Sequence, residues 1–251
     1  MRRDMDSRRH TPILGALGIL LVVACCHANA AGFYISEVGT PLSLGTAGSA
    51  NVTNTFGPDA TWTNPAGLVH IEDGVMFAGL QVIAPTMKWD TDIAEKGGIE
   101  GGNAGESAVV PSFYYAQSLT DKWHFGFGFS ALQGGGADYG DNFAGRYGTI
   151  DIALTGVGAT WSLGYEVNDR LAVGFGASLI HATYEQDIAL NLGPLPDGKV
   201  KIKDADDMAV QPIVGLQYAI TDSLLLGINY RAEYDAKLSG NIQFKKIPDA
   251  V

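Results

Sequence analysis

The chain has 251 residues, of which 17% are charged and 33 are glycine, and its formal net charge is −11. An average soluble domain has about 25% charged residues and about 7% glycine, so this composition excludes a helical bundle, a coiled coil and a charged disordered chain. The negative charge argues against a nucleic-acid partner, which needs a basic surface. After residue 24 no run of 18 apolar residues occurs, which excludes a protein that spans a membrane with several helices.

The first thirty residues have the pattern of an export signal. A start with four arginines and a short apolar stretch, residues 13–24, precede the small residues Ala28 and Ala30, as in a signal peptide cleaved after residue 30. About a dozen apolar residues are too few to cross ~30 Å of bilayer as a helix, which argues against a membrane anchor. Lipid attachment at Cys25 is the alternative. Cleavage would remove both cysteines of the chain, so neither a disulfide framework nor a cysteine metal site is expected.

Residues 31–72 show no strand-like alternation of apolar and polar side chains. They are rich in small residues, and small residues permit close packing against another part of the chain. Forty residues without a strand pattern, placed ahead of a sheet, either hang outside that sheet or fold into its interior. We expect them to form a segment distinct from the strand-forming region, residues 73–251.

Seven strands are predicted from alternating apolar and polar residues. Their approximate ranges are 74–85, 107–119, 123–132, 151–166, 171–187, 206–220 and 224–244. Short turns follow the second, fourth and sixth strands, and each contains a Thr-Asp or Asn-Asp pair, at residues 120–121, 168–169 and 221–222. Such side chains favour tight turns because they bond to nearby backbone N–H groups. The other connections are long, at about 86–106, 133–150 and 187–205, so a hairpin followed by a long loop repeats along the chain.

The third strand shows most clearly that each strand has two different faces. One face is aromatic and the other is small or polar: Trp123, Phe125, Phe127 and Phe129 alternate with His124, Gly126, Gly128 and Ser130. A secreted β-sandwich would bury the apolar face between two sheets, whereas a transmembrane barrel would turn it toward lipid. Strands of ten or more residues, and short turns that alternate with long loops, favour a transmembrane antiparallel β-barrel in the bacterial outer membrane. The secreted sandwich is the alternative.

The number of strands is odd, whereas bacterial single-chain barrels have an even number. A last strand with an unpaired edge would be intolerable in lipid, because its backbone groups would lack hydrogen-bond partners. We therefore expect the chain to be the N-terminal half of a longer barrel, or to associate in order to close one.

The region before the first strand carries a family resemblance. Its motifs are Gly32-Phe33, the small-residue run 44–50, and Asp59-Ala60-Thr61 followed by Asn64-Pro65-Ala66-Gly67; a further one is the run 139–147 in the loop after the third strand. With these motifs the chain resembles the FadL/TodX-type outer-membrane transporters of fatty acids and hydrocarbons, over about half the length of that family. The resemblance implies a fourteen-stranded barrel, of which about seven strands are present, plugged by an N-terminal hatch at residues 31–72 that carries the Asn64, Pro65, Ala66 motif.

The resemblance also implies a route for the transported molecule. A hydrophobic ligand, a long-chain fatty acid or a hydrocarbon, binds in an apolar pocket of the lumen and leaves sideways through a kink in the third strand. Gly126 and Gly128 are the candidates for that kink, although glycines that merely fit a crowded lumen are an equal alternative. Candidate ligand-binding residues are Phe113, Tyr114, Leu132, Phe143, His181 and Arg231.

Two of these candidates have a competing interpretation. Arg231 has Glu233 two residues along on the same face, so an internal ion pair is favoured over a ligand contact. His181 shares a face with Leu179, which suggests that it faces lipid. The fifth strand has neither Arg nor Lys between residues 178 and 185, which leaves neutral hydrocarbons open as ligands beside fatty acids.

Catalytic and metal-binding patterns are absent from the sequence. The five histidines lack metal spacing, and neither a nucleophile elbow nor a phosphate-binding loop occurs, so no cofactor, no metal and no enzymatic activity are expected, with a hydrolase as the remote alternative. Asp204, Asp206 and Asp207 are expected in a solvated loop, with a divalent-cation bridge to lipopolysaccharide as the second interpretation. Expected partners are a hydrophobic ligand, outer-membrane lipid and lipopolysaccharide, and the barrel-assembly machinery. A porin-like barrel without a specific ligand is the alternative function.

Overall fold

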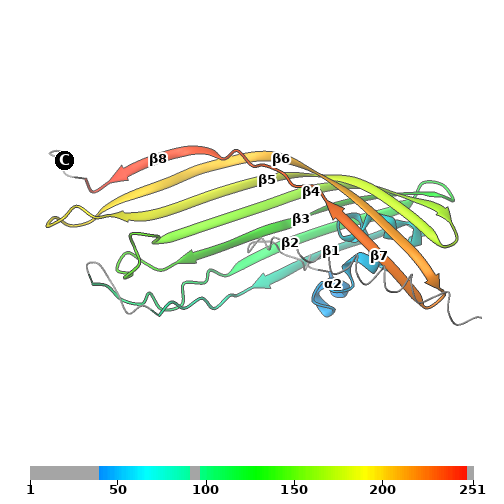
Figure 1. Cartoon of the computed structure of the whole chain (residues 1–251), viewed down its shortest axis with the longest axis horizontal. Coiled ribbons are helices and arrows are strands. Elements are labelled where there is room, and N and C mark those ends of the chain that lie inside the picture. Colours follow the sequence, from blue (N-terminus) through cyan, green and yellow to red (C-terminus); the bar gives the residue numbers. More distant parts are fainter. Residues whose placement is uncertain (1–39, 91–96, 248–251) are drawn as a thin grey trace, which may run out of the picture. The chain divides into compact units, whose positions relative to one another are not determined.

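The computed structural model describes residues 40–90 and 97–247. The predicted signal peptide and Cys25 lie outside these residues. The strands are β1 (Val75–Ile83), β2 (Ala108–Ser118), β3 (Trp123–Asp138), β4 (Asp151–Asn168), β5 (Leu171–Leu190), β6 (Gly198–Thr221), β7 (Leu224–Arg231) and β8 (Ser239–Lys245). All pairings between them are antiparallel, as Figure 1 shows, so the predicted all-β antiparallel architecture is confirmed.

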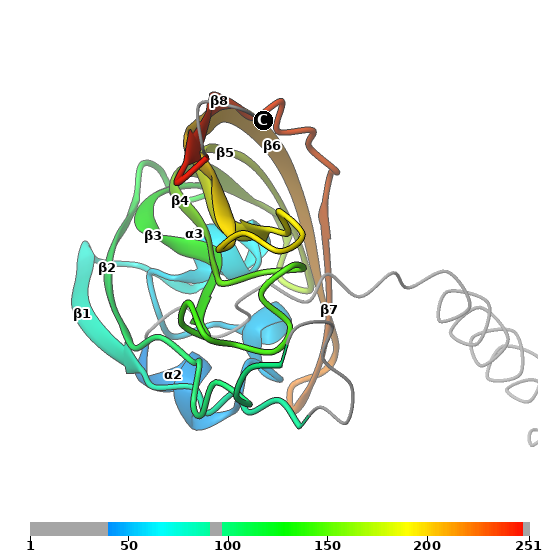
Figure 2. The ribbon, with the colours of Figure 1, turned by 90° about the vertical axis from the view of Figure 1, so that its left-hand side faces the viewer.

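The strands form one sheet in the order of the sequence from β1 to β7, and β8 pairs with β6. Among the described residues β1 pairs only with β2 and β7 only with β6, so the sheet is open at both edges. This open sheet is what a partial barrel would leave. The sheet curls strongly when it is viewed along the strands (Figure 2).

Within residues 40–72, four short helices precede the sheet. They are α2 (Pro41–Gly45), η1 (Asn51–Thr53), α3 (Ala60–Thr63) and η2 (Pro65–His70). Both α2 and η2 have proline at the first helical position and a side-chain cap, from Thr40 and Asn64 respectively, which are favourable starts for a helix. In the part of the chain that the structure describes, no helix has the length and apolar character needed to span a bilayer.

The tight turns form at the predicted positions, but in two of them the side chain that accepts the hydrogen bonds is not the aspartate. In the turn between β4 and β5, the Oδ1 atom of Asn168 accepts hydrogen bonds from the backbone N–H groups of Arg170 and Leu171, both at 3.0 Å. In the turn between β2 and β3, Thr120 Oγ1 accepts from Trp123 N at 3.0 Å. The first residue of each pair, and not the aspartate, therefore makes the turn contact in these two cases. We call the end of the strands at which these tight turns lie the turn end, and the opposite end of the strands the loop end.

The two faces of the sheet are inverted relative to a soluble protein. Large apolar side chains of the outer, convex face are exposed, among them Phe129, Trp161, Phe175, Val214 and Ile228, which are 40–56% exposed. Small and polar side chains of the inner, concave face are buried, among them Ser130, Thr160, Ser162, Ser178 and Gln217. Exposure of the apolar face fits a lipid surrounding. The alternative of a sandwich, in which that face is buried against a second sheet, does not agree with this pattern.

Several predicted boundaries are wrong at the loop end. β3 continues to Asp138 and β6 begins at Gly198, so the loops predicted at 133–150 and 187–205 shorten to residues 139–150 and 191–197. Asp204, Asp206 and Asp207 consequently lie within β6 and not in a solvated loop. Hydrogen bonds to neighbouring strands outweigh the weak strand preference of such charged residues.

The predicted last strand, 224–244, is divided. Its two halves, β7 and β8, both pair with β6, and residues 232–238 interrupt the ladder between them. Tyr234 in this interruption packs against the buried apolar cluster of the concave face, and its hydroxyl contacts Gln133 Nε2 of β3. An inward contact of this kind leaves no local sequence signal, because alternation continues through the interruption.

Candidate functional site

Residues 40–72, which we call the N-terminal segment, lie within the curve of the sheet (Figure 2). In Figure 1 the segment, drawn in blue, lies toward the turn end of the strands. Its residues from Asn54 to Leu68 include many that are completely buried, Trp62 and Leu68 among the largest. The contact surface between this segment and the concave face is the candidate functional site.

A row of glycines on the sheet receives the segment. Gly164, Gly174 and Gly215 are direct cross-strand partners on β4, β5 and β6. A Cβ atom on Gly174 would overlap backbone atoms of Pro65 and Ala66, and one on Gly164 would lie 2.9 Å from the Pro65 carbonyl oxygen. A Cβ on Gly215 would collide with the Asn64 carboxamide. The helix η2 therefore rests on bare sheet backbone, an approach that only glycine allows.

Asn64 fastens the segment to the two strands at one edge of the sheet. Its Nδ2 atom lies 3.2 Å from the Leu216 carbonyl oxygen of β6 and 3.3 Å from that of Ile228 in β7. The same atom lies 2.7 Å from the Val52 carbonyl oxygen within the segment. Its Oδ1 atom accepts from Ala66 N at 3.1 Å, which caps η2. One completely buried carboxamide thus joins three parts of the chain.

Other polar side chains of the inner face bind backbone carbonyl groups of the segment. Asn229 Nδ2 donates to the Thr63 carbonyl oxygen at 2.6 Å, and Ser162 Oγ donates to that of Thr61 at 2.7 Å. Gln217 Nε2 donates to the carbonyl oxygens of Val52 at 3.1 Å and Asn54 at 3.2 Å. These bonds satisfy carbonyl groups that the short helices leave without an intrahelical partner.

Within the segment, a buried carboxylate organises the chain. Asp59 is 1% exposed; its Oδ2 accepts from Thr40 Oγ1 at 2.7 Å and its Oδ1 from Asn54 Nδ2 at 2.9 Å. Asn54 Oδ1 in turn accepts from the backbone N–H groups of Phe56 and Gly57, both at 3.1 Å. A buried carboxylate is tolerated where hydrogen bonds replace its hydration. Asp59 therefore holds together the parts of the segment that contain Thr40 and Asn54.

Two histidines hold the end of the segment next to β1. His70 Nε2 lies 3.1 Å from Gln217 Oε1, and His124 Nδ1 of β3 lies 3.1 Å from the Ile71 carbonyl oxygen. Because a carbonyl oxygen only accepts, His70 carries a hydrogen on Nε2 and His124 carries one on Nδ1 in these contacts. Burial lowers the pKa of His70 below its ordinary value, an effect that the positive form of His124 strengthens and that Glu166 and the Gln217 bond oppose.

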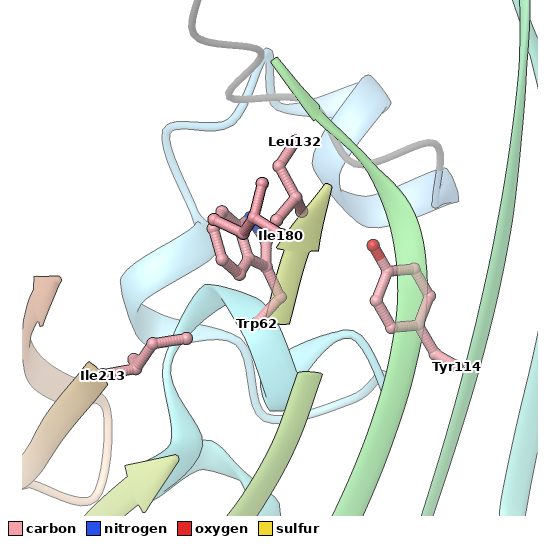
Figure 3. Close-up of a cluster of buried hydrophobic side chains, with 5 residues drawn as sticks. All are labelled: Trp62, Tyr114, Leu132, Ile180 and Ile213. Carbon is pink, nitrogen blue, oxygen red and sulfur yellow. The ribbon is translucent and has the colours of Figure 1, made fainter. Parts of the chain in front are cut away.

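A buried apolar cluster joins the segment to four strands. Trp62 packs with Tyr114 of β2, Leu132 of β3, Ile180 of β5 and Ile213 of β6, as Figure 3 shows. The opposite side of the indole faces Arg231, whose guanidinium carbon lies 4.1 Å from the ring centroid and whose Nη2 donates to the Trp62 carbonyl oxygen at 2.7 Å. The segment thus supplies one side chain, Trp62, to an apolar cluster whose other members come from the strands.

The strands β2 and β3 part beside this cluster. Their ladder ends at the pair Ser112 and Ser130, and residues 131–135 of β3 are then paired only with β4. From Gly136 onward β3 is hydrogen-bonded again on this side, to residues 104–106 of the chain ahead of β2. A bulge follows at once, because the register with β4 shifts between Ala131 and Gln133 and leaves Leu132 without a partner. Gly126 and Gly128, the candidates for a kink, both keep regular partners on β2 and β4, so the register shift lies beyond them. Their role is steric: a Cβ on Gly126 would overlap Thr61, and one on Gly128 would lie 2.7 Å from the Tyr114 ring.

The structure brings together only some of the predicted ligand-binding residues. Tyr114, Leu132 and Arg231 surround Trp62. Phe113 lies on the convex face with its ring centroid 6.3 Å from that of Phe127.

The other two candidates also lie away from the cluster. His181 lies on the convex face and pairs with Asp206 at 3.1 Å. Phe143 is buried in the loop at 139–150, where it stacks on Tyr139 with 4.4 Å between centroids. For Phe113 and His181 the pocket role is therefore wrong, because strand alternation turns both side chains outward.

The loop end contains a charged cavity of about 660 Å³. Its lining includes Ile99, Asp141, Arg146, Ile150, Asp197, Lys199 and Lys246. Arg146 Nε donates to Asp197 Oδ2 at 2.8 Å, and its Nη1 donates to the Gly97 carbonyl oxygen at 2.8 Å. Lys199 Nζ lies 2.6 Å from Asp141 Oδ1, and this contact lowers the pKa of the Asp141 carboxyl. Arg146 thus ties together three loop segments over this end of the sheet.

Sequence reasoning missed Gln217 and Asn229, which bind the segment. A signal was present, since both are polar residues at inner-face positions of otherwise apolar strands. Within residues 40–90 and 97–247, no group of three or more His, Cys, Asp or Glu side chains is arranged to hold a metal ion.

The sheet is open, curled and antiparallel, with an apolar exterior and a polar interior that receives the N-terminal segment. These features define a partial β-barrel of the outer-membrane type. The sequence model of the family described as "Outer membrane protein transport protein (OMPP1/FadL/TodX)" matches residues 21–250. The chain therefore belongs to this family of bacterial outer-membrane proteins, whose members are transport channels and not enzymes.

Relatives and solved structures agree with this assignment. The chain is 25% identical over 203 residues to outer membrane protein P1 of Haemophilus influenzae, covering 74% of this chain and 44% of that protein. It is 23% identical over 259 residues to the long-chain fatty acid transport protein of Escherichia coli O6:H1, covering 90% and 55%. The chain thus spans about half the length of the curated relatives it matches.

Two crystal structures have the same fold. A Pseudomonas aeruginosa FadL homologue superimposes with a TM-score of 0.70 at 22% identity, over 86% of this chain and 56% of that one. The Ralstonia pickettii toluene transporter TbuX superimposes with a TM-score of 0.67 at 21% identity, over 83% and 60%.

Proposed function

We propose that this chain takes part in the passive uptake of hydrophobic small molecules across the bacterial outer membrane, with the N-terminal segment as the plug of the lumen. The observation that carries the proposal is the seating of η2 on the glycine row, together with the place of Trp62, from the same segment, in the cluster beside which β2 and β3 part. A seated plug denies solutes a straight aqueous passage, and the parted strands offer a sideways one.

In the proposed route, a hydrophobic molecule enters from the loop end and binds against the cluster around Trp62. It leaves sideways past the Leu132 bulge, where residues 131–135 of β3 have no partner on the β2 side. No chemical step is involved, because transport needs only binding and a change in packing. The names of two relatives, a long-chain fatty acid transport protein and a toluene transporter, support a hydrophobic ligand of this general kind.

The experiment that tests this function is a saturation measurement. The chain, extracted from outer membranes in detergent, is dialysed to equilibrium against radiolabelled toluene and, separately, radiolabelled oleate, with micelles alone as the blank. Saturable binding of either molecule supports the proposal. Non-saturable partition equal to that of the micelles contradicts it and favours the porin-like alternative, in which the lumen is a simple pore. Boiled and unboiled samples on a denaturing gel show whether the extracted protein is a folded barrel.

A further inference from the structure

The pairing along one edge of β6 is interrupted midway, and the interrupting residues are anchored at both ends. Residues 232–238, which we call the strap, separate the β6–β7 ladder from the β6–β8 ladder. At one end, Gln211 Nε2 donates to the Ala232 carbonyl oxygen at 2.9 Å. At the other end, Lys237 N donates to Asp207 Oδ2 at 2.6 Å. Both ends of the strap are therefore held to β6, and only its middle departs from the line of the strand.

Such an interruption is costly in a strand that crosses a bilayer, because ladder hydrogen bonds are given up. The strap lies opposite residues 207–212, close to the middle of β6. Irregular backbone at membrane depth is tolerated where it faces the interior of the protein and not the lipid. The strap meets this condition, because Tyr234 packs against the cluster that contains Trp62 on the concave face. A departure from regular structure that places one side chain in the lumen points to a functional role for that side chain.

The bulge of β3 directs two consecutive side chains toward the same face. A Cβ on Gly158 of β4 would overlap Leu132, and one on Gly156 would overlap Gln133, so both side chains lie over bare backbone of β4. Gln133 is also the middle residue of 131–135, which have no partner on the β2 side and which we call the exit segment. The bulge thus presents one polar side chain of the exit segment to the lumen.

One hydrogen bond joins the strap to the exit segment. Gln133 Nε2 donates to the hydroxyl oxygen of Tyr234 across the concave face, between residues that are 101 apart in the chain. The ring of the same tyrosine packs against the cluster around Trp62, where the transported molecule is proposed to bind. Because the ring and the hydroxyl belong to one rigid group, the ring cannot leave the cluster and keep this bond. A molecule that takes the place of the ring therefore also releases Gln133.

We propose that Tyr234 and Gln133 form the gate of the sideways route: their hydrogen bond holds the exit segment closed, and a hydrophobic molecule opens it by displacing the tyrosine ring from the cluster. This proposal rests on the proposed function and adds the regulation of the same site. A ligand shifts such an equilibrium only if it binds one state better than the other. A polar solute gains nothing from the apolar surface under the ring and leaves the gate closed.

The distance across the gap beside the exit segment reports the state of the gate. Spin labels on Val109→Cys in β2 and Ala131→Cys in β3 lie on the two sides of that gap. Their separation is measured by pulsed electron paramagnetic resonance on the full chain in detergent; both native cysteines, at positions 25 and 26, lie in the predicted signal peptide. Saturating toluene should increase the population with the longer separation.

Variants test whether the hydrogen bond itself holds the gate. Tyr234→Phe removes the hydroxyl and keeps the ring, and Gln133→Met removes the donor at similar side-chain length. Without any ligand, each should raise the ratio of the longer to the shorter separation about two- to tenfold, as the loss of one buried hydrogen bond allows. The double variant should raise it no further, because both changes remove the same bond. Tyr230→Phe on the convex face of β7, where Tyr230 is 65% exposed, is the matched control and should leave the ratio unchanged.

The possible results separate the gate from the proposed function. An unchanged ratio in Tyr234→Phe and Gln133→Met would overturn the gate, and so would an equal rise in Tyr230→Phe. Saturable binding of toluene or oleate that leaves the label separation unchanged would also overturn the gate, while the proposed function would stand. If neither molecule binds saturably, the proposed function itself fails.

Discussion

The imidazole of His70 and the carboxamide of Gln217, 3.1 Å apart, join the last residue of η2 to the concave face of β6. The same carboxamide donates to two carbonyl oxygens near the middle of the segment, those of Val52 and Asn54. One side chain of the sheet therefore contacts both the middle and the C-terminal end of the segment, and its fixed orientation requires His70 to carry its hydrogen on Nε2.

This relationship predicts that docking of the segment weakens in acid. Burial lowers the pKa of His70 below 6.5, so the folded chain binds fewer protons than the unfolded chain near that pH. The contribution to stability is complete above pH 6.5 and decreases as the pH falls below that value. The hydrogen-exchange protection factors of the amides of residues 64–71, which are corrected for the intrinsic pH dependence of exchange, should be lower at pH 5 than at pH 7.5. His70→Gln should abolish the difference, whereas His181→Gln on the convex face should preserve it; a difference that survives in His70→Gln contradicts the assignment.

The glycine row predicts a steric effect at single positions. Gly174→Ala places a methyl group on the backbone of Pro65 and Ala66, so we expect a loss of about 1–3 kcal/mol in the free energy of docking, as overpacking costs in cores. Gly45→Ala is the control, because a Cβ there has no neighbour within 4 Å. Limited proteolysis within residues 40–72 measures the effect. Equal protection of the two variants would show that η2 does not rest on β5.

Asn64 permits an almost isosteric test. Asn64→Asp replaces a donor by an acceptor beside the carbonyl oxygens of Leu216 and Ile228, so repulsion should release the segment. We expect a loss of about 2–4 kcal/mol, since a buried charge would lack partners. Asn191→Asp is the matched control, because Asn191 is exposed and uses only its acceptor, toward Gly193 N. Thermal loss of the unboiled gel band compares the two, and identical midpoints would refute the role of Asn64.

Arg146 predicts a separate effect at the loop end. Its side chain is 10% exposed and pairs with Asp197, so Arg146→Ala removes this ion pair and should loosen the loops at 139–150 and 191–197. We expect faster protease cleavage in these loops by roughly tenfold or more, with unchanged hydrogen exchange at residues 64–71. Lys246→Ala is the control, since Lys246 is 70% exposed and 4.0 Å from Asp141. Simultaneous loosening of both regions would contradict the separation of the two sites.

The sequence allowed prediction of the features that follow from local periodicity. The alternation of apolar and polar residues predicted the positions of the strands. It also distinguished the exposed face, which carries Phe129 and Trp161, from the buried face. The Thr-Asp and Asn-Asp pairs predicted the turns, because their mechanism is contained within four residues. The start of η2 at Asn64-Pro65 was visible as a motif, although its partners were not.

Contacts between distant segments could not be predicted in the same way. The bulge at Leu132 depends on pairing with β4, and the interruption after Arg231 depends on what Tyr234 meets across the concave face. For Gly126 and Gly128 the sequence left a kink and a fit to a crowded lumen equally open, and the structure shows that a Cβ at either position would meet a neighbour, Thr61 or Tyr114. A single sequence shows that a glycine is present and not which side chain occupies the space above it.

The bonds of Asn64 have a consequence for the order of folding. Its partners in β6 and β7 follow it by 152 and 164 residues, so these contacts form only after nearly every strand has been made. Contacts between such distant residues are slow to form, because the intervening chain must first be closed into a loop. The residues of the segment that bind β6 and β7 therefore remain hydrated until these two strands have formed.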